Sequence, residues 1–216
     1  TPRAIHVLES VDVIAAEDTR NTLKLLNYFG IRTRLIAHHQ HNEEQSTNGL
    51  LELLRQGKNV AIVSDAGYPL ISDPGSVVAK KVMEEGFNVV PISGSNAMLN
   101  ALVASGMNTR HFLFYGFLKA QEKERIRELH ELKYYPFTIV FYEAPHRIEK
   151  MLKSCLEVLG NRQICLAREL TKKHEEFIRG TIEEVLEIVD DIKGEMVVVI
   201  EGCSEEKNPG EDQASP

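Results

Sequence analysis

Residues 64–75, SDAGYPLISDPG, constrain the fold of this chain more than any other stretch. They follow residues 59–63, a short apolar run that predicts a buried strand. They precede a segment from Ser76 to Gly86, whose end residues favour the start and the end of a helix. The stretch is therefore predicted to be a loop at the carboxyl end of a strand, where ligands bind in open α/β sheets. Two Ser-Asp pairs, with one glycine and one proline between them and another of each after them, favour a ligand loop over a plain turn.

Composition narrows the class of protein. The chain has 216 residues, of which 43% are hydrophobic, enough for one large or two small domains with a core. We expect no membrane span and no signal peptide. Three cysteines without metal-ligand spacing indicate a reducing compartment, hence a cytoplasmic protein without a metal. The net charge of −7 argues against a uniformly basic surface, so an RNA partner would have to meet a local patch.

The first part of the chain alternates between strand and helix patterns, which predicts a mostly parallel sheet covered by helices. We assign residues 1–117 to this N-terminal α/β domain, which begins unusually on a capped helix. The expected helices are residues 1–10, 19–30, 43–56, 76–85 and 95–105. The expected strands are residues 11–18, 33–39, 59–63, 88–93 and 111–117.

The texture changes near Leu118, where a highly charged helix begins. We therefore assign residues 118–203 to a second, C-terminal α/β domain with a mixed sheet, and residues 204–216 to a disordered acidic tail. The expected strands of the second domain are residues 137–144, 163–170, 174–181 and 194–202. Its expected helices are residues 119–133, 146–159 and 181–189.

A second glycine and serine turn, residues 93–97, follows the expected strand 88–93 and precedes a helix. It is typical of a helix amino terminus whose free N–H groups face a ligand. Neither this turn nor residues 64–75 has the glycine spacing of a dinucleotide or ATP loop. The two strand-end loops, together with residues of the second domain, suggest a cofactor in a cleft between domains.

Carboxylates lie at two further strand ends. In FYEAPHR, Glu143 ends a strand and could be a base or a cap, and Arg147 could bind phosphate or pair with Glu143. In AEDTR, Glu17, Asp18 and Arg20 follow another strand, where Asp18 could instead cap the next helix. Both alternatives stay open at this point.

Two polar stretches complete the set. Residues 38–44, HHQHNEE, include His38, His39 and Asn42, which we interpret as an RNA-facing or substrate-facing loop, because a metal site would lack a fixed fourth ligand. Residues 166–176 place Arg168 and Lys172 near a strand end, where a solvated charged turn is the alternative.

These motifs together resemble the tetrapyrrole methylase superfamily. Within it, they are similar to the bacterial enzymes that methylate the 2′-hydroxyl of a cytidine ribose in small-subunit ribosomal RNA. The motifs that carry the resemblance are AEDTR, HHQHNE, SDAGYPLISDPG, PISGSNA, FLFYGFL, FYEAPHR, ARELTKKHEE and GEMVVVIEG, which span almost the whole body of the chain. The resemblance implies two α/β domains of a class III methyltransferase, S-adenosylmethionine in the inter-domain cleft, and a homodimer.

The resemblance also implies particular cofactor contacts. These are Asp65, Ala66, Gly67, Ile71, Ser93, Gly94, Ser95, Asn96, Ala97, Phe141, Tyr142, Leu170 and Thr171. The chain departs from the family pattern in two respects. The opening strand and its Pro/Gly-rich loop are missing, and the usual PGPSA turn reads Ser93-Gly94-Ser95-Asn96-Ala97 here. Tyr68, where a small threonine is commoner, would narrow the cofactor pocket.

The expected reaction is 2′-O-methylation of a cytidine in the decoding region of the small ribosomal subunit. Candidate bases are Glu143, Glu17 and Asp18. The side chains expected to contact RNA are Arg20, His38, His39, Asn42, Lys119, Lys123, Arg125, Arg127, Arg147, Arg168, Lys172 and Lys173. Two alternatives are a methyltransferase of the same fold acting on a small tetrapyrrole-like acceptor, and a non-catalytic regulatory module that binds an adenosine ligand.

Overall fold

A computed structural model describes residues 1–38, 43–65, 67–71, 76–189 and 192–204. The chain forms two compact units, Thr1–Asn96 and Ala97–Pro216. Their two sheets confirm the expected α/β fold class. Within the described part of the chain, no helix combines the length and the apolar character needed to cross a membrane.

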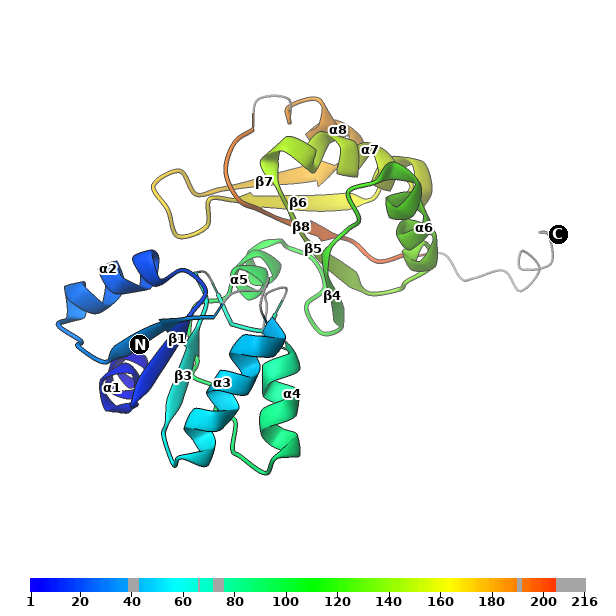
Figure 1. Cartoon of the computed structure of the whole chain (residues 1–216). Helices are drawn as coiled ribbons and strands as arrows, with labels where there is room; N and C mark the ends of the chain where they lie inside the picture. The colour runs from blue at the N-terminus through cyan, green and yellow to red at the C-terminus, as the bar shows by residue number, and fades with distance from the viewer. Residues whose placement is uncertain (39–42, 66, 72–75, 190–191, 205–216) are drawn as a thin grey trace. The chain divides into compact units, whose positions relative to one another are not determined.

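The first unit is built on a three-stranded parallel sheet with the order β2-β1-β3 (Figure 1). All four residues of the central strand β1 are buried, which explains why they are alanine, valine and isoleucine. The three strands end level with one another, because Ala16 is paired with both Ala37 and Val63. The elements are α1 (Pro2–Ser10), β1 (Val13–Ala16), α2 (Thr19–Phe29), β2 (Arg34–Ala37), α3 (Glu43–Arg55), β3 (Val60–Val63) and α4 (Ser76–Glu84).

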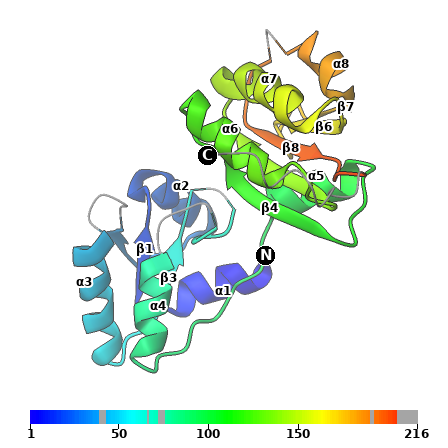
Figure 2. The same cartoon turned by 90° about the vertical axis from the view of Figure 1, so that its right-hand side faces the viewer.

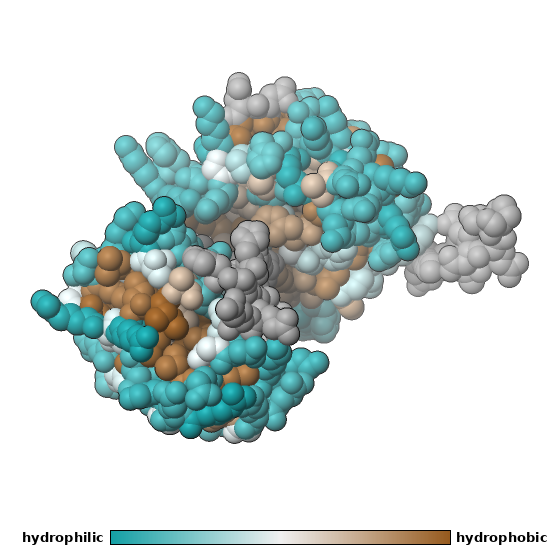
Figure 3. Space-filling view, viewed as in Figure 1, coloured by the Kyte–Doolittle hydropathy of each residue, from teal (hydrophilic) through white to brown (hydrophobic). Residues whose placement is uncertain are grey.

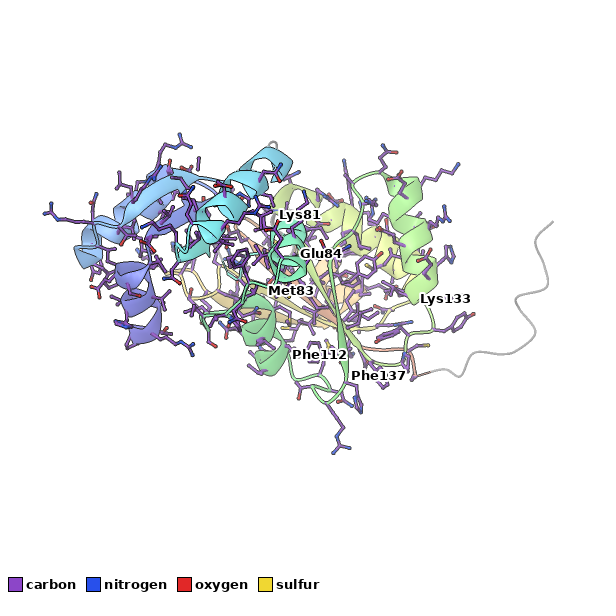
Figure 4. All side chains as sticks on the ribbon, turned by 60° about the horizontal axis from the view of Figure 1, so that its bottom comes forward. Lys81, Met83, Glu84, Phe112, Lys133 and Phe137 are labelled. Atoms are coloured by element: carbon purple, nitrogen blue, oxygen red, sulfur yellow. The ribbon has the colours of Figure 1, made fainter. Side chains whose placement is uncertain are left out.

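Successive residues of β1 face opposite sides of this sheet. Ala15 packs against α3 and α4, which contribute Leu50, Leu51, Val78 and Val82. Ile14 packs on the other side with Leu26 of α2 and Ile31, against partly buried residues of α1. Both faces are thus covered by helices, as the alternating pattern predicts. The outer side of α4 carries Lys81, Met83 and Glu84 (Figure 4), and Met83 is 58% exposed.

The prediction of a strand at residues 88–93 is wrong. This run follows α4 but forms no ladder with any described strand, and Val89 and Val90 are 46% and 60% exposed. β3 is paired along one edge only, by β1, among the described residues. A β-branched run forms a strand only where a partner offers its backbone groups, and the sequence pattern of residues 88–93 carries no information about that partner.

The second unit contains a five-stranded mixed sheet with the order β4-β5-β8-β6-β7 (Figure 1), and Figure 2 shows the same unit turned by 90°. β4 and β5 are parallel, and all other neighbours are antiparallel. The elements are α5 (Ala97–Ala104), β4 (Phe112–Phe117), α6 (Glu122–Leu132), β5 (Thr138–Glu143), η2 (Pro145–Arg147), α7 (Ile148–Leu159), β6 (Gln163–Arg168), β7 (Glu176–Thr181), α8 (Ile182–Leu186) and β8 (Met196–Ile200).

Each face of the five-stranded sheet has its own apolar cluster. Ile139 and Phe141 of β5 belong to the larger cluster, which is covered by α6, α7 and α8. Val140 belongs to the smaller cluster with α5, and Tyr142 packs against it. Phe112 and Phe137 mark the opposite end of β4 and β5 from Glu143 (Figure 4).

The division into units falls earlier in the chain than the boundary expected near Leu118. β4 pairs with β5 along its length, and α5 packs on the same sheet through Ala101 and Leu102. Both elements therefore belong to the second unit. The high content of charged residues at 119–133 reflects the surface helix α6 and does not mark the start of a new hydrophobic core.

Candidate functional site

The carboxylates of AEDTR and SDAG come together at the carboxyl end of the three-stranded sheet. Glu17 follows β1 and Asp65 lies just beyond β3, and the Asp65 backbone N–H donates to Glu17 Oε2 at 3.3 Å. The Asn21 side chain donates to Asp65 Oδ2 at 2.8 Å. Two motifs separated by more than forty residues thus form one polar edge, since these parallel strands end in register.

Asp18 is the N-cap of α2. Its carboxylate accepts from the backbone N–H of Arg20 at 2.8 Å and from the Arg20 side chain at 3.0 and 2.7 Å. These contacts hold the pKa of Asp18 far below its ordinary value. A carboxylate with so low a pKa is a poor proton acceptor, so the capping alternative describes Asp18 better than the base. Arg20 keeps an exposed side chain (87%).

The two glycine-containing segments of the first unit are tied together by Tyr68. The Gly94 N–H donates to the Tyr68 hydroxyl at 3.2 Å. Gly67 has a left-handed φ of 73°, and the non-glycine Leu70 has φ 76°, a backbone strain that is concentrated at functional loops. Ile71 is exposed, as are Ser93, Gly94 and Ser95. Ala66 lies outside the described residues.

The histidine stretch is described only at His38. Its ring is buried, and Nδ1 shares a 2.9 Å hydrogen bond with Ser46 Oγ of α3. His38 therefore fastens the end of β2 to α3 and offers no surface to RNA, contrary to the expectation. His39 and Asn42 lie outside the described residues.

Glu143 lies inside the second unit. Its side chain is fully buried, on the face of β5 covered by α6 and α7. Oε1 accepts from the Ala144 N–H at 2.8 Å and pairs with Arg147 Nε at 3.2 Å, while Oε2 has no hydrogen-bond partner among the described residues. Burial raises the pKa of Glu143. A buried carboxylate on this face does not reach a substrate hydroxyl, so the geometry opposes the base alternative.

Two arginines of the expected RNA surface are built into the second unit. Arg125 is buried and donates to Ser154 Oγ and to the Ala120 carbonyl, each at 3.0 Å. It therefore has no access to RNA, which corrects the expectation. Arg147 donates to the Leu118 carbonyl at 2.6 Å in addition to its pair with Glu143. Its position favours the Glu143 partner over a phosphate.

The charged residues after β6 pair with acidic neighbours. Arg168 pairs with Glu176 at 2.6 Å, and Lys172 pairs with Glu169 and Glu195 at 3.2 and 2.9 Å. By contrast, Lys119, Lys123 and Arg127, in and before α6, are exposed. Lys173 is exposed as well. Only some of the side chains expected to contact RNA are therefore both exposed and outside these ion pairs.

Three of the expected cofactor residues lie in one place in the second unit. Ala97, Tyr142 and Leu170 all pack against the smaller apolar cluster. Thr171 follows with a φ of 65° and donates its N–H to Glu175 Oε2 at 2.5 Å. Phe141 differs from the expectation, because its side chain is fully buried on the opposite face from Tyr142. Only its backbone is left to meet a ligand.

Sequence reasoning missed Asn21 and Glu169. Asn21 binds Asp65 from the first turn of α2, and only its place directly after AEDTR could have indicated this. Glu169 lies within ARELTKKHEE, where the sequence leaves a solvated charged turn open as an alternative; its carboxylate accepts a backbone hydrogen bond from Glu195. Contacts of this kind depend on which loops meet, so the local sequence does not encode them.

The structure is that of a two-unit α/β protein with polar side chains at the carboxyl ends of the strands of its first unit. The chain belongs to the tetrapyrrole methylase family: the model for the Tetrapyrrole (Corrin/Porphyrin) Methylases matches residues 1–186. This membership confirms the resemblance of the motifs.

Individual relatives share about half of their residues with this chain. "Ribosomal RNA small subunit methyltransferase I" of Bacillus subtilis is 52% identical over 99% of this chain and 74% of its own length. The protein of the same name from Escherichia coli O157:H7 is 45% identical over 94% and 72%.

Solved structures agree in fold. The methyltransferase CobJ matches with a TM-score of 0.68 and 18% identity, over 96% of this chain and 90% of its own. Uroporphyrin-III C-methyl transferase from Thermus thermophilus, in complex with S-adenosyl homocysteine, matches with a TM-score of 0.64 and 18% identity, over 93% and 90%. At this identity the likeness concerns the fold alone.

Proposed function

We propose that this chain transfers a methyl group from S-adenosylmethionine to the 2′-hydroxyl of a cytidine ribose in the RNA of the small ribosomal subunit. The observation that carries the proposal is the 52% identity to an rRNA small subunit methyltransferase across 99% of the chain.

The residues present fit this cofactor. Asp65 offers a carboxylate to polar groups of the ligand. Ser93, Gly94 and Ser95 are exposed, and their backbone groups other than the Gly94 N–H, which donates to Tyr68, can face a ligand. Beside Gly67 and Gly94, no atom of the described residues beyond their chain neighbours lies within 4 Å of the position a Cβ would take, which leaves a ligand room to approach the backbone. In the second unit, Ala97, Tyr142 and Leu170 provide apolar and aromatic surface.

The proposed contacts keep the expected set, with Phe141 contributing only its backbone. They are Asp65, Ala66, Gly67, Ile71, Ser93, Gly94, Ser95, Asn96, Ala97, Phe141, Tyr142, Leu170 and Thr171. S-adenosylmethionine supplies a methyl group already activated by the positive charge of its sulfur. The chain must therefore hold the ribose hydroxyl in line with that methyl group and help remove its proton.

Of the three candidate bases, Glu17 suits this task best. Glu143 is buried and Asp18 is held by Arg20, whereas Glu17 is only half-buried. One of its oxygens accepts from the Asp65 N–H, which orients the carboxylate at the polar edge of the sheet. We propose that Glu17 accepts the ribose proton.

For RNA binding we propose the exposed cations. Arg20 follows Glu17 by three residues, and Lys119, Lys123 and Arg127 are the exposed cations in and before α6, where they alternate with glutamates. His39 and Asn42 remain candidates from the sequence. Such local groups can bind phosphates although the whole chain carries a net charge of −7.

We further propose that the protein acts as a homodimer in the cytoplasm. Support for a dimer comes from α2, where Leu23, Leu25, Tyr28 and Phe29 are exposed by 41% to 82%. Figure 3 shows hydrophobic side chains gathered on this part of the first unit. The three cysteines, Cys155, Cys165 and Cys203, lack metal-ligand spacing, which supports a reducing compartment.

The direct test uses methyl-labelled S-adenosylmethionine and small ribosomal subunits from cells that lack the enzyme. After incubation, the RNA is digested to nucleosides. Label in 2′-O-methylcytidine is the expected result. Label in a base-methylated nucleoside, or no label despite cofactor binding, would contradict the proposal and turn attention to small tetrapyrrole-like acceptors.

A further inference from the structure

The segment after β6 adopts a backbone conformation that its residues do not favour. Glu169 has φ 50° and Thr171 has φ 65°, both in the left-handed region. That region is disfavoured for residues other than glycine, and especially for a β-branched residue such as threonine. Neighbouring groups must therefore stabilise residues 169–171.

Thr171 is held by its N–H bond to Glu175, and Glu169 is held by contacts with Lys172 and Glu195. Glu169 Oε1 accepts from the Glu195 N–H at 3.0 Å and from Lys172 Nζ at 3.2 Å. Lys172 also donates to Glu195 Oε2 at 2.9 Å, and the Glu169 N–H donates to the Glu195 carbonyl at 3.0 Å. These groups fasten the β6–β7 connection to the residues that precede β8. The N–H of Glu195 and the charge of Lys172 lower the pKa of Glu169, so it stays ionised at neutral pH.

Gly194 is matched to this arrangement. A Cβ at position 194 would overlap Cγ, Cδ and Oε1 of Glu169. Gly194 also has φ 98°, a conformation that favours glycine for its own sake. We refer to Glu169, Lys172, Gly194 and Glu195 together as the Glu169 latch.

The latch adjoins Leu170 and Thr171. Leu170 packs with Ala97 and Tyr142 against the smaller apolar cluster, directly between two residues of left-handed backbone. We propose that Glu169 is a positioning residue that holds Leu170 and Thr171 in their cofactor-binding conformation. The inference rests on the proposed function, because that is what assigns these two residues to the cofactor. It also gives Lys172 a role inside the protein instead of on RNA.

The test compares four variants with wild type. Glu169→Ala removes the latch carboxylate, and Gly194→Ala displaces it while keeping every latch side chain. Glu169→Gln keeps an acceptor for the Glu195 N–H but loses the charge that faces Lys172. Lys173→Ala is the control, since Lys173 is an exposed residue of the same connection outside the latch. Affinity for S-adenosylhomocysteine is measured by calorimetry, and amide hydrogen exchange of residues 169–175 by mass spectrometry.

Glu169→Ala and Gly194→Ala are expected to weaken S-adenosylhomocysteine binding by about tenfold or more, as loss of one charged hydrogen bond implies. Amide exchange in residues 169–175 should become faster in the same two variants. Glu169→Gln should lie between these variants and wild type, and Lys173→Ala should match wild type.

Unchanged affinity in folded Glu169→Ala and Gly194→Ala would overturn the inference. A lowered melting temperature with unchanged affinity well below it would do the same, because it would show a purely structural role. Failure of wild type to bind S-adenosylhomocysteine would instead refute the proposed function. In that case the exchange rates still report whether the latch orders residues 169–175, so the two failures are distinguishable.

Discussion

Glu143 has its carboxylate inside the second unit, paired on one oxygen with Arg147 and without a hydrogen-bond partner on the other among the described residues. Burial raises its pKa. The folded protein therefore retains a proton at a pH where the unfolded chain has released it. The stability contributed by this group is complete below the ordinary value of 4.5 and is lost as the pH rises through the raised value.

Glu143→Gln should remove this pH dependence. The free energy of unfolding of wild type relative to the variant should fall as the pH rises above 4.5. Urea unfolding at several pH values measures it. Glu149→Gln is the control of opposite sign: Glu149 is partly exposed, and Lys153 lowers its pKa, so wild type should gain slightly on that variant with rising pH. A pH-independent difference for Glu143→Gln would contradict the assignment.

Glu17→Gln should lower kcat by about 10² to 10⁴-fold, the usual effect of a general base, with little change in cofactor affinity. Single-turnover methylation of small subunits measures the first quantity and calorimetry the second. Glu52→Gln, an exposed change on α3, serves as the control. An equal loss in rate and cofactor affinity would make Glu17 a supporting residue rather than a base.

The sequence placed Glu143 correctly at the end of a strand but left open which face it occupies. Strand alternation supplies the answer: Ile139, Phe141 and Glu143 share one face of β5, and helices cover that face. Only the position of α6 and α7 decides that this face is buried, and that position depends on long-range packing. The same reason explains why Arg125 could not be recognised as a buried residue.

At the scale of elements, most helices and strands lie within a few residues of their expected bounds, because caps such as Thr1, Asp18 and Gly30 mark their ends. The exception is residues 88–93. Its apolar run satisfies every local criterion for a strand, but no described neighbour pairs with it. Local preference is enough for a helix, which bonds to itself, and not for a strand, which needs a partner.

The exposed apolar residues of α2 lead to a prediction about the oligomeric state. Tyr28→Lys should shift the protein from dimer to monomer, because it puts a charge on the exposed apolar surface proposed as the interface. Light scattering after gel filtration measures the mass. Met83→Lys makes the same change at an exposed site on α4 and should leave the dimer intact. Thermal unfolding well above room temperature for both variants excludes misfolding. A monomeric wild type, or a dimeric Tyr28→Lys, would contradict the proposal.

At the scale of the whole molecule, the sequence indicated two α/β units, and the structure has two, divided between Asn96 and Ala97. The expected boundary near Leu118 followed a change in surface charge. Surface charge does not determine which strands pair, and the ladder between β4 and β5 assigns β4 to the second unit. Chain topology within that unit makes a further prediction.

A chain that ends after Lys193 should fail to fold its second unit. β8 pairs with β5 on one edge and with β6 on the other, and β4-β5 and β6-β7 share no ladder without it. Limited proteolysis should then degrade residues 97–193 rapidly. A chain that ends after Ser204 keeps both ladders and should resist the protease as the full chain does. Equal resistance of both truncated chains would show that β8 is dispensable.

The central position of β8 in the sheet has a consequence for folding during synthesis of the chain. A ribosome synthesises the chain from its amino terminus. β5 and β6 are therefore made before β8, and the edges that pair with β8 stay unpaired until that strand is available. Unpaired strand edges invite association with other chains. The nascent second unit therefore stays vulnerable until Met196–Ile200 has left the ribosome. An enzyme proposed to modify ribosomes would thus depend, for the folding of its second unit, on the translation of β8.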